Sequence, residues 1–250
     1  FYNKLQKALH LTISMGKVLK SMYLILIIVK ILVYWHVGYF RGAFMVFKDK
    51  YGHYRFKIVL YGPSLGGKTT MLKALYNKIK LRKGKLRMIA DESGRTIYFD
   101  YVPLGTSGNV FFDLYTVPGQ RRHKTQRRII LRGADAVIFV ADSDPEALEE
   151  NIYSIQELRT FLGSEWAKIP IIVVLNKRDL PDALPEVVML RVLRLDGPFP
   201  VFKTVAIEGL GVKRVFQEAT RLAVLARVFP ETYKREVEIL ARETRRKLGI

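Results

Sequence analysis

Beyond residue 54, the hydrophobic positions fall into short apolar runs separated by stretches with helical spacing. Residues 56–61 form a mostly apolar run that predicts a buried strand, and a helical stretch follows near 68–80. Residues 96–102 and 110–115 alternate apolar and polar side chains around a glycine-containing turn, which predicts a β-hairpin. Further strands are expected at 136–141, 169–175 and 200–206. Further helices are expected near 120–132, 145–163, 185–194 and 211–228.

This order of elements predicts the fold class α/β. Because strands alternate with helices except at one hairpin, we expect a mostly parallel six-stranded sheet with one antiparallel edge strand and helices on both faces. Pro230 is expected to end the last helix of this domain. The chain then has three expected parts: a hydrophobic, basic segment at 1–50, the α/β domain at 51–229, and a charged amphipathic helix at 230–250.

Residues 22–40 form a 19-residue apolar run that only Lys30 and His36 interrupt. A helix that spans a bilayer needs about 20 such residues. The aliphatic side chains and Phe of this run favour insertion by about 5 kcal/mol, and the central lysine opposes it by about 3 kcal/mol. Two interpretations stay open. The run is a membrane anchor, or it is upstream sequence before a misassigned start, since the chain begins at Phe1 and Met45 immediately precedes the domain.

Composition narrows the classes of chemistry. Hydrophobic residues make up 49% of the chain, which supports a core, and the absence of cysteine excludes disulfides, thiolate metal sites and thiol catalysis. The formal net charge of +19 suits an acidic partner, acidic lipid or nucleic acid. The same excess of Lys and Arg, with only five Asn and five Gln, is equally typical of a thermophile. Charge alone therefore identifies no ligand.

The clearest motif connects the first predicted strand to the first helix. Residues 62–70 match G-x-x-x-x-G-K-[ST] without a mismatch. In this pattern the glycines let backbone N–H groups turn towards the α- and β-phosphates of a nucleotide, at the positive end of the helix. Lys68 then reaches the β- and γ-phosphate oxygens, and the Thr69 hydroxyl coordinates Mg²⁺. The expected nucleoside triphosphate site consists of Gly62, Pro63, Ser64, Leu65, Gly66, Gly67, Lys68, Thr69 and Thr70.

A second motif, Asn176-Lys177-Arg178-Asp179, follows the strand expected at 169–175. The Asp179 carboxylate can accept two hydrogen bonds from guanine N1–H and N2–H₂, whereas adenine offers no such pair. The Lys177 stem can cover the face of the base, and Asn176 can tie this loop to the phosphate loop. Together the two motifs indicate GTP and GDP as ligands, in preference to ATP.

With these motifs the chain resembles the Ras-like GTPases, and among them the gliding-motility and polarity GTPases of the MglA type in bacteria and archaea. The resemblance covers about residues 55–228 and implies a P-loop NTPase G domain. Its most diagnostic segment is Thr116-Val117-Pro118-Gly119-Gln120, because ordinary Ras-like proteins carry Asp-x-x-Gly-Gln there. By similarity, Val205-Ala206 forms the last guanine element, with the Ala206 N–H facing O6. The other segments that carry the resemblance are 62–70, 84–86, 95–100, 140–143 and 176–181.

The resemblance also assigns roles in catalysis. It implies that Thr96 coordinates Mg²⁺ beside Thr69 and senses the γ-phosphate, although an ordinary strand-edge threonine is the alternative. Gly119 would donate its N–H to the γ-phosphate, and Gln120 would orient the attacking water. Arg95 would act as an internal arginine finger, and the alternative for Arg95 is a solvated side chain on the switch loop. The expected catalytic residues are therefore Lys68, Arg95 and Gln120.

Two residues depart from the usual pattern. Thr116 stands where an Asp normally holds Mg²⁺ through water, so we expect the metal to be held less tightly. Asp113 is not expected to substitute, because strand alternation places it on the opposite face. Ser64 stands where Ras proteins keep a glycine, and its side chain would crowd an arginine supplied by another protein.

The expected surfaces are strongly charged. Residues 121–128 form a very basic stretch, which is either a solvated helix face or a contact for an acidic partner. The 231–248 helix carries an apolar stripe that is expected to pack on the domain, with partner or membrane binding as the alternative. Asp142, Asp144 and the glutamates that follow are interpreted as charges at a helix N-terminus.

These observations predict a small GTPase switch that binds GTP and Mg²⁺, hydrolyses GTP slowly, and rearranges residues near 85–97 and 117–128. An effector and a GTPase-activating protein are expected partners, nucleic acid is not, and a membrane surface stays open. The expected location is the cytoplasm or the cytoplasmic face of a membrane. Two alternatives remain: a non-hydrolysing scaffold, which Thr116 favours, and a membrane-anchored receptor subunit for protein targeting, which residues 22–40 favour.

Overall fold

The computed structural model describes residues 49–78, 82–87, 100–105 and 109–248. The chain divides into two units, Phe1–Met45 and Val46–Ile250, and every described residue belongs to the second unit. The apolar run at 22–40 lies outside the described residues, as do Arg95 and Thr96. Among the helices that the structure describes, none has both the length and the apolar character needed to cross a bilayer.

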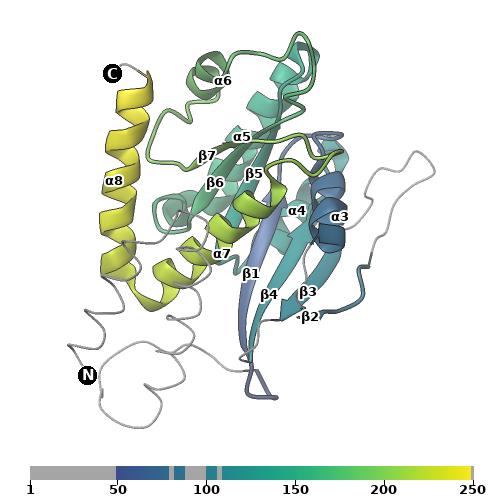
Figure 1. The fold of residues 1–250 in the computed structure, drawn as a ribbon, viewed down its shortest axis with the longest axis vertical. Coiled ribbons are helices and arrows are strands. Elements are labelled where there is room, and N and C mark those ends of the chain that lie inside the picture. Colours follow the sequence, from purple (N-terminus) through teal and green to yellow (C-terminus); the bar gives the residue numbers. More distant parts are fainter. Residues whose placement is uncertain (1–48, 79–81, 88–99, 106–108, 249–250) are drawn as a thin grey trace. The chain divides into compact units, whose positions relative to one another are not determined.

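A single twisted sheet forms the centre of the second unit (Figure 1). Its strand order is β2-β3-β4-β1-β5-β6-β7. The five strands from β4 to β7 run parallel, and β3 runs antiparallel to β4. The strands are β1 (Tyr54–Tyr61), β2 (Arg82–Lys83), β3 (Tyr101–Gly105), β4 (Val110–Thr116), β5 (Ala136–Asp142), β6 (Ile171–Asn176) and β7 (Val201–Lys203).

The six predicted strands are all present, and two of them end three residues away from the predicted end. The described part of the hairpin begins with β3 at Tyr101 and continues to Gly105, so this strand extends past the predicted end at 102. The two-residue β2 pairs with β3, so the antiparallel strand has one short neighbour at the edge. β7 ends at Lys203 and not at 206, because Thr204 and Ala206 turn away to bond the side chain of Asn176.

Helices cover both faces of the sheet, as the alternation of elements predicts. Along β1, Leu60 packs with α3 and α7, whereas its neighbours Val59 and Tyr61 belong to the core that α4, α5 and α6 cover. This two-sided burial explains why β5 and β6 are apolar at nearly every position. The helices are α3 (Lys68–Lys78), α4 (Lys124–Leu131), α5 (Leu148–Leu162), α6 (Glu186–Val192), α7 (Val212–Val228) and α8 (Pro230–Leu248).

The C-terminal helix α8 returns to the domain along α7. Arg221 of α7 bonds Glu218 on its own helix at 2.7 Å and Glu236 of α8 at 3.3 Å. α7 ends at Val228 as predicted, and Pro230 opens α8, where its missing N–H has no helical partner to lose. The ion pair supports the expectation that this amphipathic helix packs on the domain.

Candidate nucleotide-binding site

Four loops meet where the parallel strands end. The phosphate loop follows β1, the segment 117–120 follows β4, residues 176–179 follow β6, and residues 204–206 follow β7. Leu60 of β1 pairs in register with Thr116 of β4, so these two strands end at the same level. In an open parallel sheet, ligands bind beyond the carboxyl ends of the strands at the point where the strand order reverses. Here β1 lies at that point, between β4 and β5.

The phosphate loop has the compact shape that its motif predicts. Gly67 has φ +96°, and a Cβ there would lie 2.1 Å from the Nδ2 of Asn176, so only glycine fits. Leu65 also has positive φ, and its side chain points to solvent. The nine predicted residues form one continuous strand–turn–helix segment, in which α3 starts at Lys68.

Lys68 is buried at the first turn of α3 and points back across the loop. Its Nζ donates hydrogen bonds to Gly62 O at 3.0 Å and Pro63 O at 2.5 Å. Burial, and then the charge of nearby Arg127, lower the pKa of Lys68 to about 7. A phosphate group in the loop would oppose both effects, because an anion favours the charged ammonium.

Asn176 connects three of the four loops. Its Nδ2 donates to Gly66 O in the phosphate loop at 3.0 Å. Its Oδ1 accepts from the Thr204 hydroxyl at 2.9 Å and from the Ala206 N–H at 3.0 Å. The predicted link to the phosphate loop is therefore present, and a second link reaches the 204–206 segment. The side chain of Asp179 is exposed at the mouth of this arrangement.

Lys177 is held in place by Asp142 at the end of β5. The Lys177 Nζ lies 2.5 Å from Asp142 Oδ2, and the Asp142 side chain is only 3% exposed. Asp142 also accepts a hydrogen bond from the Asp144 N–H. Asp142 therefore has a role that the sequence did not predict, because its carboxylate pairs with Lys177 as well as bonding the N–H next to the following helical turn. Asp144 acts as the predicted helix-terminal charge, since it accepts from the Glu146 N–H at 2.9 Å.

Asp100 is a site residue to which the sequence analysis gave no role. The Thr69 and Thr116 hydroxyls both donate to Asp100 Oδ2, at 2.5 Å and 2.7 Å. The Asp100 N–H in turn donates to the Thr116 hydroxyl at 3.0 Å. Both Asp100 and Thr116 are buried. The hairpin register contained the signal, since Tyr101 pairs with Tyr115 and places Asp100 directly opposite Thr116.

This donor set fits a hard cation. Two threonine hydroxyls and one carboxylate are oxygen ligands, which Mg²⁺ prefers alongside phosphate oxygens. Asp113 does not contribute, as predicted, because its carboxylate bonds Arg55 and Tyr101. The observation corrects one premise of the sequence analysis. A carboxylate stands beside the Thr69 hydroxyl after all, and it comes from Asp100, the residue before β3.

The segment after β4 lies directly against the phosphate loop. The Val117 N–H donates to Leu60 O at 3.2 Å, which continues the β1–β4 pairing towards the site. A Cβ on Gly119 would lie 2.4 Å from the backbone N of Ser64, so the two backbones touch and only glycine fits. Gln120 is half-buried and begins the 3₁₀ turn Arg121–His123 that leads into α4.

The basic stretch 121–128 is only partly a surface. Arg121, Arg122, Lys124 and Arg128 are exposed, and Arg121 pairs with Glu150 at 2.7 Å. Arg127 is 2% exposed, which contradicts its assignment to a solvated or partner-facing basic surface. Its guanidinium turns inward to Glu157 of α5, because Glu157 is the buried carboxylate within reach of that helix face.

Comparison with known proteins places this geometry in a family. Residues 44–221 match the model of the ADP-ribosylation factor family. The chain is 41% identical over 176 residues to the mutual gliding-motility protein MglA of Myxococcus xanthus, covering 67% of this chain and 90% of that protein. It is 29% identical over 164 residues to human ADP-ribosylation factor-like protein 4A, covering 63% of this chain and 78% of that protein.

A solved structure has the same fold. The Arl6 small GTPase of Trypanosoma brucei, determined with the nucleotide analogue GppNp, matches with a TM-score of 0.54 and 22% identity. The match covers 68% of this chain and 97% of that chain. The alternatives of a non-hydrolysing scaffold and a targeting-receptor subunit are not favoured by these relatives. The chain belongs to the ADP-ribosylation factor family of small GTPases, which are GTP-binding molecular switches that hydrolyse GTP.

Proposed function

We propose that this GTPase recognises guanine through Asp179, holds the phosphates with Lys68 and Mg²⁺, and hydrolyses GTP with water oriented by Gln120. The observation that carries the proposal is the triple contact of Asn176. One buried side chain fixes the phosphate loop, the 176–179 loop and the 204–206 segment relative to one another. A guanine nucleotide that bridges the first two loops therefore meets a preformed site.

Lys68 and the phosphate loop bind the charged end of the nucleotide. The buried Lys68 ammonium would exchange part of its contact with the Gly62 and Pro63 carbonyls for β- and γ-phosphate oxygens. The N–H groups at the start of α3 add the positive end of the helix. Mg²⁺, when bound, neutralises the charge that develops on the transferred phosphoryl group. Thr69 would hold it through its hydroxyl, and Asp100 would occupy the outer position that an Asp at 116 normally fills.

Gln120 and Gly119 act at the reacting phosphate. The contact between Gly119 and Ser64 keeps the backbone N–H of Gly119 at the edge of the phosphate loop. Gln120 is the next residue, so its amide would reach an attacking water on that side. Arg95 completes the proposed catalytic set as an arginine finger in cis, and Thr96 completes the metal ligands. Both lie outside the described residues and remain proposals from the sequence.

Switching requires a surface that changes with the nucleotide. The segment 117–128 is the described candidate, because it touches the phosphate loop at one end and exposes Arg122, Lys124 and Arg128 at the other, next to the exposed Ile129. A basic face with one exposed apolar side chain suits an effector or GTPase-activating protein with an acidic contact surface. Membrane association through residues 22–40, at the cytoplasmic face, stays a prediction.

Two measurements test the proposal. Displacement of a fluorescent GDP analogue by GTP and by ATP should give at least about a hundredfold preference for GTP, because two charge-assisted hydrogen bonds are at stake. Conversion of bound GTP to GDP in a single turnover should require Mg²⁺. Lys68→Ala serves as the control that abolishes tight binding of both nucleotides. Equal displacement by ATP and GTP would refute guanine recognition by this site.

A further inference from the structure

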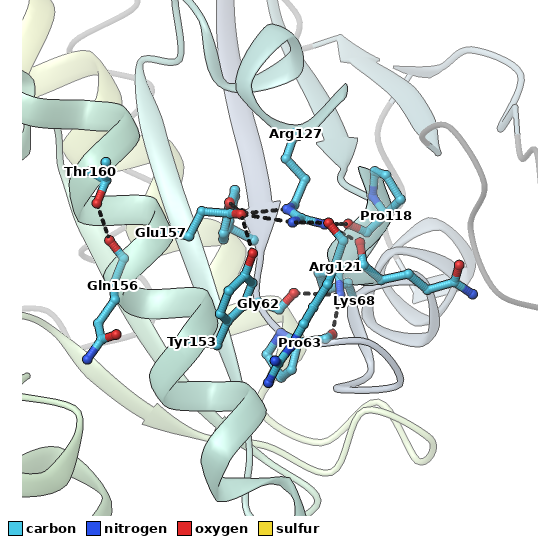
Figure 2. Close-up of polar contacts among 12 residues, drawn as sticks. Gly62, Pro63, Lys68, Pro118, Arg121, Arg127, Tyr153, Gln156, Glu157 and Thr160 are labelled. Carbon is cyan, nitrogen blue, oxygen red and sulfur yellow. Dashed lines mark hydrogen bonds and ion pairs between the residues drawn. The ribbon is translucent and has the colours of Figure 1, made fainter. Parts of the chain in front are cut away.

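A buried polar cluster lies between the sheet and the second switch, by which we mean the segment 117–128 (Figure 2). Arg127 of α4 and Glu157 of α5 face one another at its centre, and the Tyr153 hydroxyl of α5 also reaches Glu157. Tyr61, the last residue of β1, reaches Glu157 from the sheet at 2.5 Å. We name Arg127, Glu157 and Tyr61 the switch clamp. Because Gly62 follows Tyr61 directly, this clamp is one residue from the phosphate loop.

Every donor of the Arg127 guanidinium is used. A guanidinium has five N–H groups in a rigid planar fork. Nε donates to Glu157 Oε2 at 2.6 Å and Nη2 to Glu157 Oε1 at 2.9 Å, which makes the pair bidentate. The remaining three donors go to backbone carbonyls of the second switch. These are Pro118 O at 3.1 Å, Gln120 O at 2.5 Å and Arg121 O at 3.3 Å.

Glu157 is equally well satisfied. Its two oxygens accept from the two Arg127 donors, from the Tyr61 hydroxyl, and from the Tyr153 hydroxyl at 3.1 Å. The Arg127 and Glu157 side chains are 2% and 4% exposed. Burial by itself would raise the pKa of Glu157, but the hydrogen bonds from Arg127 and Tyr61 lower it. The pair is therefore charged within the protein.

Stability is a weak reason for such a pair. Two charges lose their hydration when they are buried, and replacing both by apolar side chains of similar size is often neutral or stabilising. Apolar side chains, however, cannot donate hydrogen bonds to the three backbone carbonyls that Arg127 contacts. The carbonyls of Pro118 and Gln120 lie on either side of Gly119, and those of Gln120 and Arg121 lead into α4. The clamp thus fixes the backbone around Gly119 and Gln120, the two residues that are proposed to act at the γ-phosphate.

We propose that Arg127 is a positioning residue for GTP hydrolysis, which holds the 118–121 backbone so that Gly119 stays against the phosphate loop and Gln120 faces the attacking water. The inference rests on the proposed role of Gln120. Arg127 acts through the three backbone carbonyls that it bonds. Lysine cannot replace Arg127, because its compact ammonium cannot reach three backbone carbonyls and the Glu157 carboxylate at the same time.

The test compares single and double substitutions. Arg127→Met leaves Glu157 buried and charged, so this variant should be slower and also less stable. The double variant Arg127→Met/Glu157→Met leaves no unpaired charge, so its thermal stability should return close to that of the parent. Its single-turnover rate should nevertheless stay at least tenfold below the parent, and its GTP affinity should change less than threefold. Arg127→Lys should also be slow.

Arg221→Met is the matched control. Arg221 is likewise mostly buried and pairs with two glutamates, but on α7 and α8, away from the phosphate loop. Its loss should lower stability without changing the hydrolysis rate. A second readout is backbone amide exchange of residues 119–123 in the nucleotide-bound protein. It should accelerate in the double variant and not in Arg221→Met.

The outcomes separate the clamp from the proposed function. If the stable double variant hydrolyses GTP within twofold of the parent and its 119–123 amides stay protected, Arg127 is only a packing residue and the inference fails. If the parent itself does not hydrolyse GTP, the proposed function fails. The amide exchange then still decides whether Arg127 holds the segment. Slow hydrolysis with faster exchange in the double variant supports the inference.

Discussion

The two ends of the nucleotide site are held in different ways. At the base end, Asn176 bonds Gly66, Thr204 and Ala206, so the loops are tied to one another by a side chain that belongs to the site. At the switch end, the backbone from 118 to 121 is tied by Arg127, which lies behind the site on α4. The difference matches what each end has to do. The contact with the base is needed with both GTP and GDP. The switch segment, in contrast, must change its position when the γ-phosphate is lost and return when GTP binds again.

The proposed Mg²⁺ position belongs to the switch end in this respect. Asp100 is the residue before β3 and bonds Thr69, and it follows the segment predicted to rearrange. Because Asp100 would complete the proposed ligand set of Mg²⁺, that set depends on the position of the start of β3. At the base end, by contrast, Lys177 takes its support from Asp142 at the end of the central strand β5.

The largest effect is expected at the base end. Asp179→Asn removes the carboxylate that accepts two guanine hydrogen bonds, so GTP affinity should fall about a hundredfold, or about 3 kcal/mol. Xanthosine triphosphate should bind better than GTP, because its 2-oxo group accepts from an amide. Fluorescent-nucleotide displacement with both ligands measures the change. Unaltered preference for GTP would place guanine recognition elsewhere.

A smaller effect is expected at the metal position. Asp100→Asn should weaken Mg²⁺ binding to the GDP-bound protein about tenfold, since outer ligands orient the residues that hold the metal. Chelation with EDTA should speed GDP release strongly in the parent, and Asp100→Asn should reduce this response. Titration of Mg²⁺ against GDP release rates gives the affinity.

Asp113→Asn is the control for the metal position. Asp113 is also a mostly buried carboxylate in the same hairpin, but it bonds Arg55 on the other face. Loss of this ion pair should lower stability and leave the Mg²⁺ titration unchanged. Equal Mg²⁺ affinities for the parent and Asp100→Asn would show that the site does not use this carboxylate.

The smallest effect sharpens the account of the base end. Asp142→Asn removes the ion pair of Lys177 and should weaken both GTP and GDP about fivefold, or about 1 kcal/mol. Asp144→Asn serves as its control, because Asp144 caps the neighbouring turn and does not touch Lys177. If the two variants bind nucleotide equally well, Lys177 needs no support from β5.

The sequence allowed the base end to be predicted more completely than the switch end. The motifs at 62–70 and 176–179 place all their residues within a few positions of one strand end, so spacing alone indicates the chemistry. The spacing of hydrophobic residues predicted the six strands and the helices between them. Most of the predicted bounds differ from those in the structure by a few residues. The end of β7 could not be foreseen, because it depends on the bonds that Asn176 makes.

The residues that were missed depend on distant parts of the chain. Asp100 matters only once the hairpin register sets it opposite Thr116, although counting outward from the turn would have revealed that register. Arg127 sits in a run of basic residues, and nothing in the run distinguishes it from its exposed neighbours. Its partner Glu157 is 30 residues away on another helix, so their pairing follows from helix packing alone.

The measurement that tests the central claim most directly is the single-turnover conversion of bound GTP to GDP by the full chain, in the parent and in Gln120→Leu. The account predicts Mg²⁺-dependent hydrolysis in the parent. It also predicts a rate at least about tenfold lower in Gln120→Leu, or about 1.4 kcal/mol in the barrier, because the orienting amide is lost. GTP affinity should be nearly the same in both. Hydrolysis by Gln120→Leu within twofold of the parent would contradict the proposed role of the segment that follows β4.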